Sequence, residues 1–221
     1  MINNESVGLV IPCHNEEAGL KRLLPLVPKE VDHILIIDNN CTDTTATIAR
    51  QFGAEIVTEK IPGYGQAYQA GFKAIQTDIV VTMDGDGQYP VEDIPRLVPS
   101  FQKRNLDFLS ASRFPMKTAS MPLLRQIGNI LLTAAATILF GTRIKDTQSG
   151  MWIFRRTLLQ KVQPKENGMP FSEEFKIKVI QAGLSFGEEH IVYQERSGIS
   201  KLVPFADGWR NLLYLIRLRF E

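Results

Sequence analysis

The stretch VVTMDGDGQYP, residues 80–90, decides how this chain of 221 residues is interpreted. Apolar β-forming residues lead directly into the carboxylates of Asp84 and Asp86, which glycines separate and Gln88 follows. Two carboxylates so close together repel each other. One interpretation is a tight turn, because Asp-Gly pairs favour turns. The other is a site for a divalent cation, which prefers carboxylate and amide oxygens.

The composition is that of a single globular domain, with 44% hydrophobic and 22% charged residues. A net charge of +1 creates no field that attracts nucleic acid, so we expect no nucleic-acid partner. Cys13 and Cys41 lack the spacing of a metal site and are expected to be free thiols. With neither a signal peptide nor a long apolar run in the sequence, we expect a cytoplasmic location.

Strands and helices alternate along the first half of the chain. Apolar runs predict strands at residues 7–12, 33–38, 54–59, 78–84 and 107–114. The segments between them predict helices within residues 14–27, 44–52, 65–75 and 90–104. Asn15 is expected to cap the first helix. This order predicts an α/β fold with a mainly parallel sheet and helices on both faces.

The second half is less regular. We expect an amphipathic helix over 121–141, a turn and strand over 145–156, a helix over 172–183 capped by Ser172, a strand within 185–196 and an amphipathic C-terminal segment over 207–220. The chain is therefore divided into a domain of residues 1–205 and a C-terminal helix of residues 206–221.

Polar residues follow three of the predicted strands. They are residues 12–16, 38–40 and 84–88. Ligands of parallel sheets bind at the carboxyl ends of the strands, so these segments are expected to share one edge. The sequence contains no GxGxxG after the first strand and no Walker motif, so a nucleotide's phosphates would need another counter-charge. With Asp38 on the same edge, the cation site is favoured over the simple turn.

Seven segments match a known family in its order. They are VIPCHNE (10–16), IIDNNCTDTT (36–45), GYGQAYQAGF (63–72), MDGDGQYPVEDIP (83–95), SRF (112–114), DTQSGMWIFRR (146–156) and QERSGISKL (194–202). They resemble a family 2 glycosyltransferase of the GT-A (Rossmann-like) fold, and within it the dolichyl-phosphate mannosyltransferase group. Asn39, Asn40 and Cys41 replace the family's Asp-Gly-Ser, and Thr44 replaces a glycine, which leaves the choice of nucleotide open.

The resemblance implies an inverting, metal-dependent glycosyltransferase. It would move a hexose, mannose or glucose, from a GDP- or UDP-sugar to a polyprenyl or dolichyl phosphate. The implied nucleotide-sugar-binding residues are Pro12, Asn15, Glu16, Asp38, Asn40, Asp84, Gly85 and Lys201. The implied ligands of Mg²⁺ or Mn²⁺ are Asp84, Asp86 and Gln88. The implied acceptor-phosphate residues are Arg113 and Arg125, and the implied catalytic residues are Asp86, Arg113 and Arg196.

The type of acceptor decides whether a base is needed. A phosphate monoester, with a second pKa of about 6, is largely dianionic near neutral pH and is already a nucleophile. A hydroxyl acceptor would instead require a carboxylate base, for which Glu173 and Glu174 are candidates. A hydroxyl-specific glycosyltransferase is therefore one alternative, and a nucleotide-binding protein without catalysis is another.

A polyprenyl acceptor would place the protein at a membrane surface. The helix of residues 121–141 and the C-terminal segment, with Trp209, Arg210 and Arg217, combine apolar and basic residues suited to an interface. Alternatively, both helices pack on the core or form a dimer contact. We expect a peripheral protein at the cytoplasmic face of a membrane and leave its oligomeric state open.

Overall fold

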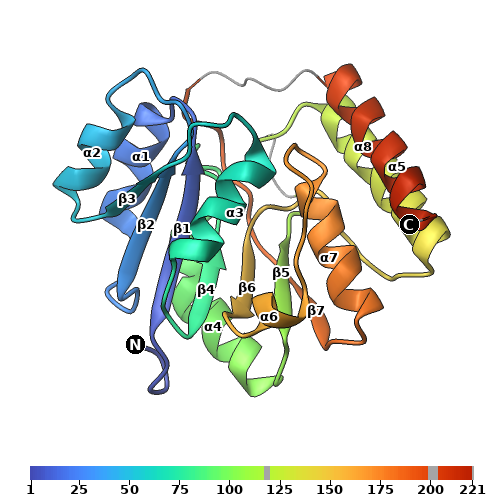
Figure 1. The fold of residues 1–221 in the computed structure, drawn as a ribbon, viewed down its shortest axis with the longest axis horizontal. Helices are drawn as coiled ribbons and strands as arrows, with labels where there is room; N and C mark the ends of the chain where they lie inside the picture. Colours follow the sequence, from blue (N-terminus) through green and yellow to red (C-terminus); the bar gives the residue numbers. More distant parts are fainter. Residues whose placement is uncertain (117–119, 199–203, 221) are drawn as a thin grey trace.

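The computed structural model describes residues 1–116, 120–198 and 204–220. In this part of the chain seven strands form one sheet in the order β3-β2-β1-β4-β6-β5-β7 (Figure 1). The strands are β1 (Val7–Cys13), β2 (His33–Asp38), β3 (Glu55–Thr58), β4 (Ile79–Thr82), β5 (Phe108–Ser112), β6 (Trp152–Arg155) and β7 (Phe186–His190).

The sheet is mainly parallel, as expected. The exception is β6, which runs antiparallel to both of its neighbours, β4 and β5, whereas the other neighbouring pairs are parallel. The local sequence of β6 does not reveal this direction, because strand direction depends on the path of the preceding connection. Its consequence is functional: the segment 146–150, which precedes β6, reaches the same edge as the segments that follow β1, β2 and β4.

Helices cover both faces of the sheet, which confirms the α/β expectation. They are α1 (Glu17–Leu23), α2 (Thr45–Gln51), α3 (Tyr64–Ala74), α4 (Ile94–Lys103), α5 (Leu123–Phe140), α6 (Leu158–Lys161), α7 (Phe171–Gln181) and α8 (Pro204–Arg219), with 3₁₀ turns η1 (Leu24–Leu26) and η2 (Val91–Asp93). Residues of α1, α2 and α4 pack on one face, and residues of α3, α6 and α7 on the other. The α5–α8 pair lies side by side at the β7 end and packs against α7 (Figure 1).

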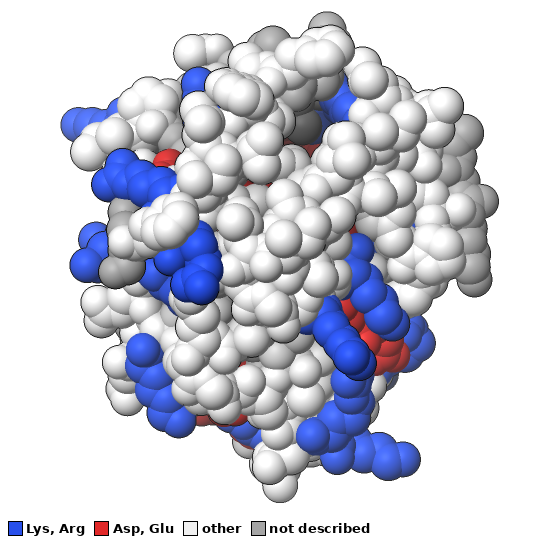
Figure 2. All heavy atoms as spheres, turned by 90° about the vertical axis from the view of Figure 1, so that its right-hand side faces the viewer, with Lys and Arg blue, Asp and Glu red and all other residues white. Residues whose placement is uncertain are grey.

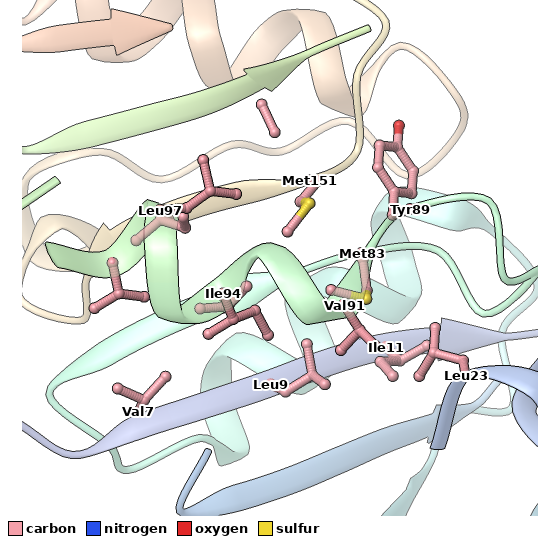
Figure 3. Packing of buried hydrophobic residues seen from close by; sticks show 14 of the residues in the cluster. Val7, Leu9, Ile11, Leu23, Met83, Tyr89, Val91, Ile94, Leu97 and Met151 are labelled. Carbon is pink, nitrogen blue, oxygen red and sulfur yellow. The ribbon is translucent and has the colours of Figure 1, made fainter. Parts of the chain in front are cut away.

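Successive residues of β1 enter different cores. Leu9 and Ile11 belong to the cluster beneath α4, whereas Val10 belongs to the cluster beneath α3, as the period of two of a strand requires. Ile94 of α4 belongs to the first cluster as well, and so does Tyr89, which follows Asp84 and Asp86 in the chain (Figure 3). The loop that carries the two carboxylates is therefore tied directly into the hydrophobic core.

Two capping predictions are wrong. Asn15 has a positive φ of 53° and its Oδ1 accepts hydrogen bonds from the backbone N–H groups of Thr42 (2.6 Å) and Asp43 (3.3 Å). It therefore joins the loops after β1 and β2 instead of capping α1. Ser172 lies inside α7, because Pro170 takes the N-cap position and the helix begins at Phe171.

Close packing of α1 against the carboxylate loop yields a testable prediction. A Cβ on Gly19 would lie 2.7 Å from the Cα of Asp86, whereas a Cβ on Gly128 in α5 would meet nothing within 4 Å. Gly19→Ala should destabilise the protein by about 1–3 kcal/mol through overpacking. The matched Gly128→Ala should stabilise it by about 0.5–1 kcal/mol through helix propensity. Urea denaturation measures both, and equal effects would contradict the packing argument.

Candidate active site

Asp84 and Asp86 follow β4 at the carboxyl edge of the parallel strands, where Asp86 is buried and Asp84 is half-buried. The Tyr64 hydroxyl donates to Asp84 Oδ1 (2.9 Å), and the backbone N–H of Gln88 donates to Asp86 Oδ1 (3.0 Å). Burial raises the pKa of both carboxyls, and the neighbouring charge of Asp86 helps to raise the pKa of Asp84 to about 7. Two neighbouring, largely desolvated carboxylates whose charges repel each other fit a divalent cation, which would relieve the repulsion.

Protein side chains alone do not complete such a cation site. Within residues 1–116, 120–198 and 204–220, no group of three or more His, Cys, Asp or Glu side chains is placed to hold a metal ion. A cation at Asp84 and Asp86 would therefore take its other ligands from water and from a bound diphosphate, as is usual for Mg²⁺. Asp84 and Asp86 fit the role of two protein ligands of such a cation.

Gln88 has protein partners on both ends of its amide. Its Oε1 accepts from the Tyr193 hydroxyl (3.0 Å), and its Nε2 donates to the carbonyls of Ser120 (3.2 Å) and Gln194 (3.1 Å). The side chain thus braces the carboxylate loop against the segment after β7. Its assignment as a metal ligand stays a prediction, and the structure gives it this structural role in addition.

Arg196 links two of the predicted site residues. Its Nη1 donates to Asp86 Oδ2 (2.6 Å) and its Nη2 to Glu16 Oε1 (2.8 Å). This guanidinium supplies the counter-charge that the two acidic segments need. Lys201, predicted to act with it, lies outside the described residues.

Of the predicted nucleotide residues, Asn15 and Glu16 line a cavity of about 280 Å³, whereas Pro12, Asp38, Asn40 and Gly85 lie outside its lining. Asp38 Oδ1 accepts the backbone N–H of Cys41 (2.9 Å), and the Asn40 amide donates to the carbonyl of Lys60 (2.9 Å). Pro12 lies in β1, next to the segment that leads to the cavity. The cavity is lined by Asn15, Glu16, Glu17, Ala18, Asp43, Ser197 and Gly198. Gly85 is required by close packing, because a Cβ there would lie 2.8 Å from Cys13 Sγ.

On the other side of the carboxylates, Arg113 and Asp146 form a buried ion pair. Arg113 Nε and Nη2 donate to the two carboxylate oxygens of Asp146, each at 2.8 Å, and the Arg113 backbone N–H adds a third bond of 3.0 Å. Although burial opposes it, the charge of Arg113 holds the pKa of Asp146 below its ordinary value. Arg113 also lies over the ring of Tyr193, 5.3 Å from its centroid. Arg125 lies in the first turn of α5, half-buried, and its role stays a prediction.

Sequence analysis did not single out three tyrosines that hold this site together. Tyr64 bonds to Asp84, Tyr193 bonds to Gln88, and the Tyr89 hydroxyl accepts the backbone N–H of Gly150 (2.7 Å). Burial raises the pKa of all three hydroxyls, so they act as neutral hydrogen-bonding groups. Tyr64 and Tyr89 lie within segments that match the family and Tyr193 precedes one, so the sequence could have indicated that they are near the site.

The two candidate bases for a hydroxyl acceptor are both committed elsewhere. Glu174 accepts the backbone N–H groups of Lys165 (2.9 Å) and Glu166 (2.7 Å) and pairs with Lys178. Glu173 is fully buried and accepts a hydrogen bond from the side chain of Gln148. Burial raises the pKa of Glu173 to about 8, so at neutral pH it is mostly protonated and a poor base.

Glu173 also yields a prediction about stability. A folded pKa of about 8, against an ordinary value of 4.5, contributes stability that is complete below the ordinary value and is lost as the pH rises towards 8. Glu173→Gln removes this titration. The melting temperature of the variant minus that of the wild type should therefore rise from pH 5 to pH 8 and stay constant at higher pH. Thermal melts across this range test it. The exposed Glu92→Gln serves as control and should show no such gain.

Comparisons with known proteins agree with this geometry. The sequence profile of Glycosyl transferase family 2 matches residues 9–163. A dolichyl-phosphate hexose transferase of Haloferax volcanii is 32% identical over 207 residues, covering 92% of this chain and 90% of the relative. The low-salt glycan biosynthesis hexosyltransferase Agl6 of the same organism is 28% identical over 96% of this chain, which spans about half (53%) of that relative's length. A UDP-N-acetylglucosamine–dolichyl-phosphate N-acetylglucosaminyltransferase of Methanococcus voltae is 28% identical, and the match covers 94% of this chain and 95% of the relative.

Among solved structures, glucosyl-3-phosphoglycerate synthase from Mycobacterium tuberculosis has the same fold. Its complex with Mn²⁺, UDP and glucosyl-3-phosphoglycerate superposes with a TM-score of 0.76 at 21% identity, covering 98% of this chain and 80% of that one. Another complex of the same enzyme contains Mg²⁺ and UDP. This likeness confirms the GT-A-like fold, and the family match confirms the resemblance in the motifs. The chain therefore belongs to glycosyltransferase family 2 and is an enzyme of the hexosyltransferase class.

Proposed function

We propose that this enzyme transfers a hexose from a nucleotide-sugar to a polyprenyl phosphate, with inversion at the anomeric carbon. The observation that carries the proposal is that two groups of side chains lie at one edge of the sheet: the carboxylates of Asp84 and Asp86, and the ion pair of Arg113 with Asp146. The carboxylates of half-buried Asp84 and buried Asp86 lie near the buried Arg113, while both candidate bases are committed to other partners. Relatives whose names specify dolichyl phosphate support the choice of acceptor.

On the donor side, the leaving group is a nucleoside diphosphate, which needs positive charge. Mg²⁺ or Mn²⁺ held by Asp84 and Asp86 would supply Lewis-acid stabilisation of that diphosphate. Arg196, already within hydrogen-bond distance of Asp86, brings a guanidinium to the same place. A guanidinium can donate two parallel hydrogen bonds to phosphate oxygens, so Arg196 would stabilise the charge that develops as the sugar leaves.

On the acceptor side, Arg113 would hold the phosphate nucleophile. A guanidinium has five N–H donors, and Arg113 directs its Nε and Nη2 groups at Asp146. The donors that remain can bind phosphate oxygens, while the ion pair fixes the plane of the guanidinium. A dianionic phosphate needs no proton removed before it attacks, which agrees with the protonated state of Glu173.

The decisive experiment compares two acceptors that differ only in the phosphate. The enzyme receives Mn²⁺, a panel of radiolabelled GDP- and UDP-sugars, and either dolichyl phosphate or dolichol. We expect lipid-extractable label with dolichyl phosphate alone, lost on chelation of the metal and retained in Glu173→Gln. Label on dolichol would instead support the hydroxyl-acceptor alternative. Failure of every donor, together with calorimetry that detects no metal-dependent nucleotide binding, would leave the donor-site assignment without support.

The α5–α8 pair presents an apolar surface suited to a membrane. The exposed apolar residues on α5 are Leu123, Leu124, Ile127, Ile130, Leu131 and Ile138, and those on and just after α8 are Phe205, Trp209, Leu213, Ile216 and Phe220. Their spacing of three and four residues places them on one stripe of each helix. Figure 2 shows this side of the molecule, with a broad uncharged area bordered by basic side chains. Contiguous apolar surface of this kind marks an interaction site.

We propose that this surface lies on a bilayer containing anionic lipids. Within the described residues, α5 is the one helix long and apolar enough to cross a membrane, and only 17% of it is buried. Its packing on α8 favours a position in the interface, where exposed Arg210, Arg217 and Arg219 would meet anionic headgroups. Such a position brings the acceptor's headgroup to the enzyme. The cytoplasmic side of that membrane stays a prediction.

Tryptophan fluorescence tests the membrane surface. The chain has two tryptophans; Trp152 is fully buried and Trp209 is 63% exposed, so a change in emission reports Trp209. Vesicles containing phosphatidylglycerol should shift the emission to shorter wavelength, and Trp209→Phe should abolish the shift. Ile138→Asp on α5 should weaken vesicle co-sedimentation about tenfold, whereas the control Phe52→Asp, far from this surface, should not. A concentration-dependent dimer with no vesicle binding would contradict the proposal.

A further inference from the structure

Lys176 is a buried cation that the proposed reaction leaves without a role. It lies in α7 with 0% exposure. Its Nζ donates to the carbonyls of Asp146 (2.8 Å), Thr147 (3.0 Å) and Ser149 (2.8 Å). An ammonium has three N–H donors, so the backbone of one loop uses all of them. The lysine holds segment 146–150 much as a bound cation would, by gathering its carbonyl oxygens around a single positive charge.

This loop touches both halves of the site. At its start, Asp146 forms the two-pronged ion pair with Arg113. At its end, Gly150 packs so closely on Asp84 that an added Cβ would lie 3.0 Å from Asp84 Oδ1. Gly150 is held independently of Lys176, because its backbone N–H donates to the Tyr89 hydroxyl (2.7 Å) and its carbonyl accepts the Thr82 hydroxyl (2.9 Å). A change in the path of residues 146–149 would therefore move the acceptor arginine and leave the donor carboxylate largely in place.

The buried charge is expensive, so its presence calls for a specific reason. Removing an ammonium from water is unfavourable, and replacing buried ionic groups by apolar residues of similar volume is often neutral or stabilising. In agreement, burial lowers the pKa of Lys176 to about 8. A methionine would fill much of the same space, beside the Trp152 ring 5.9 Å from Nζ, without this penalty. A methionine could not donate hydrogen bonds to the three carbonyls, and it carries no positive charge.

The position of Asp146 matters for the acceptor arginine, because Asp146 is the ion-pair partner of Arg113. Lys176 fixes the backbone carbonyls of Asp146 and of its neighbours in the loop. Glu188, which accepts the backbone N–H groups of Lys145 (2.7 Å) and Asp146 (3.1 Å), partly offsets the charge of the lysine, so the role of Lys176 is geometric. We propose that Lys176 is a positioning residue for Arg113, which fixes segment 146–150 so that Asp146 presents the guanidinium to the acceptor phosphate. The inference rests on the proposed polyprenyl-phosphate acceptor.

Steady-state kinetics of Lys176→Met provide the test, with dolichyl phosphate and nucleotide-sugar varied in turn. The KM for dolichyl phosphate should rise at least about tenfold, the loss expected when a charge-assisted phosphate contact is weakened. The KM for the nucleotide-sugar and the calorimetric affinity for nucleotide with Mn²⁺ should change less than about twofold, because Asp86 and Arg196 are untouched. Lys178→Met, at a half-buried position of the same helix where the lysine pairs with Glu174 and not with segment 146–150, is the matched control and should leave all these constants unchanged.

A double-mutant cycle separates positioning from general damage. If Lys176 acts through Arg113, then Lys176→Met should raise the acceptor KM far less in an Arg113→Lys background than in the wild type. Full additivity would overturn the inference, as would an unchanged acceptor KM in an active Lys176→Met enzyme. Should Lys176→Met not fold, Lys176→Gln, which keeps two N–H donors without the charge, takes its place under the same criteria. A wild type that transfers to no polyprenyl phosphate would overturn the proposed function itself, which is a distinct result.

Discussion

A buried salt bridge between Arg113 and Asp146 joins the parts of the site to one another. Both side chains are withdrawn from water, and a buried pair is tolerated only when geometry and further hydrogen bonds are good. Here two parallel bonds to Asp146 and the Tyr193 ring hold the guanidinium, and the Arg113 backbone N–H donates a further bond to the Asp146 carboxylate. Removing either partner would leave an uncompensated buried charge, a loss of about 3–5 kcal/mol in comparable proteins.

From this salt bridge, direct contacts lead to the donor carboxylates. The Tyr193 ring lies under Arg113, its hydroxyl donates to Gln88, and the Gln88 backbone N–H donates to Asp86. These contacts join three segments of the chain, which carry Arg113, Tyr193 and the loop of Asp86 and Gln88. Groups that are positioned by several independent segments can be held to fractions of an ångström, which is what in-line transfer between two bound substrates requires.

Much of the fold was accessible from the sequence, because apolar runs and helical periodicity are local signals. The strand of residues 33–38 was predicted with the bounds that the structure has, and the approximate position of each main helix was predicted as well. The direction of β6, the ion-pair partner of Arg113 and the hydrogen-bond partners of Asn15 were not, because each depends on residues distant in sequence. Asn15, for example, finds its partners at Thr42 and Asp43, 27 and 28 residues away.

Two of the residues that depart from the family's usual pattern, Asn39 and Cys41, have structural partners in the loops of the site. Asn39 donates to the carbonyls of Glu59 and Ile61 and accepts the backbone N–H of Gly63, so it ties three loop positions together. Cys41 accepts the backbone N–H of Asn15, and burial raises the pKa of its thiol to about 11, which keeps it protonated and unreactive. Asn39 and Cys41 therefore hold together the loops next to the predicted nucleotide-binding residues.

Arg113 and Asp146 also stand at the two ends of one long excursion from the sheet, 33 residues apart in sequence. The excursion leaves after β5, includes α5 and returns before β6, and the salt bridge closes it like a clasp at the rim of the catalytic core. Because closure entropy grows only with the logarithm of loop length, the exposed residues of this segment can change in number or kind at little cost in free energy, as long as Leu132, Thr133 and Ala136 keep their buried contacts. On the membrane placement proposed above, such changes would fit the same catalytic core to a different lipid surface, and the segment would act as an interchangeable module.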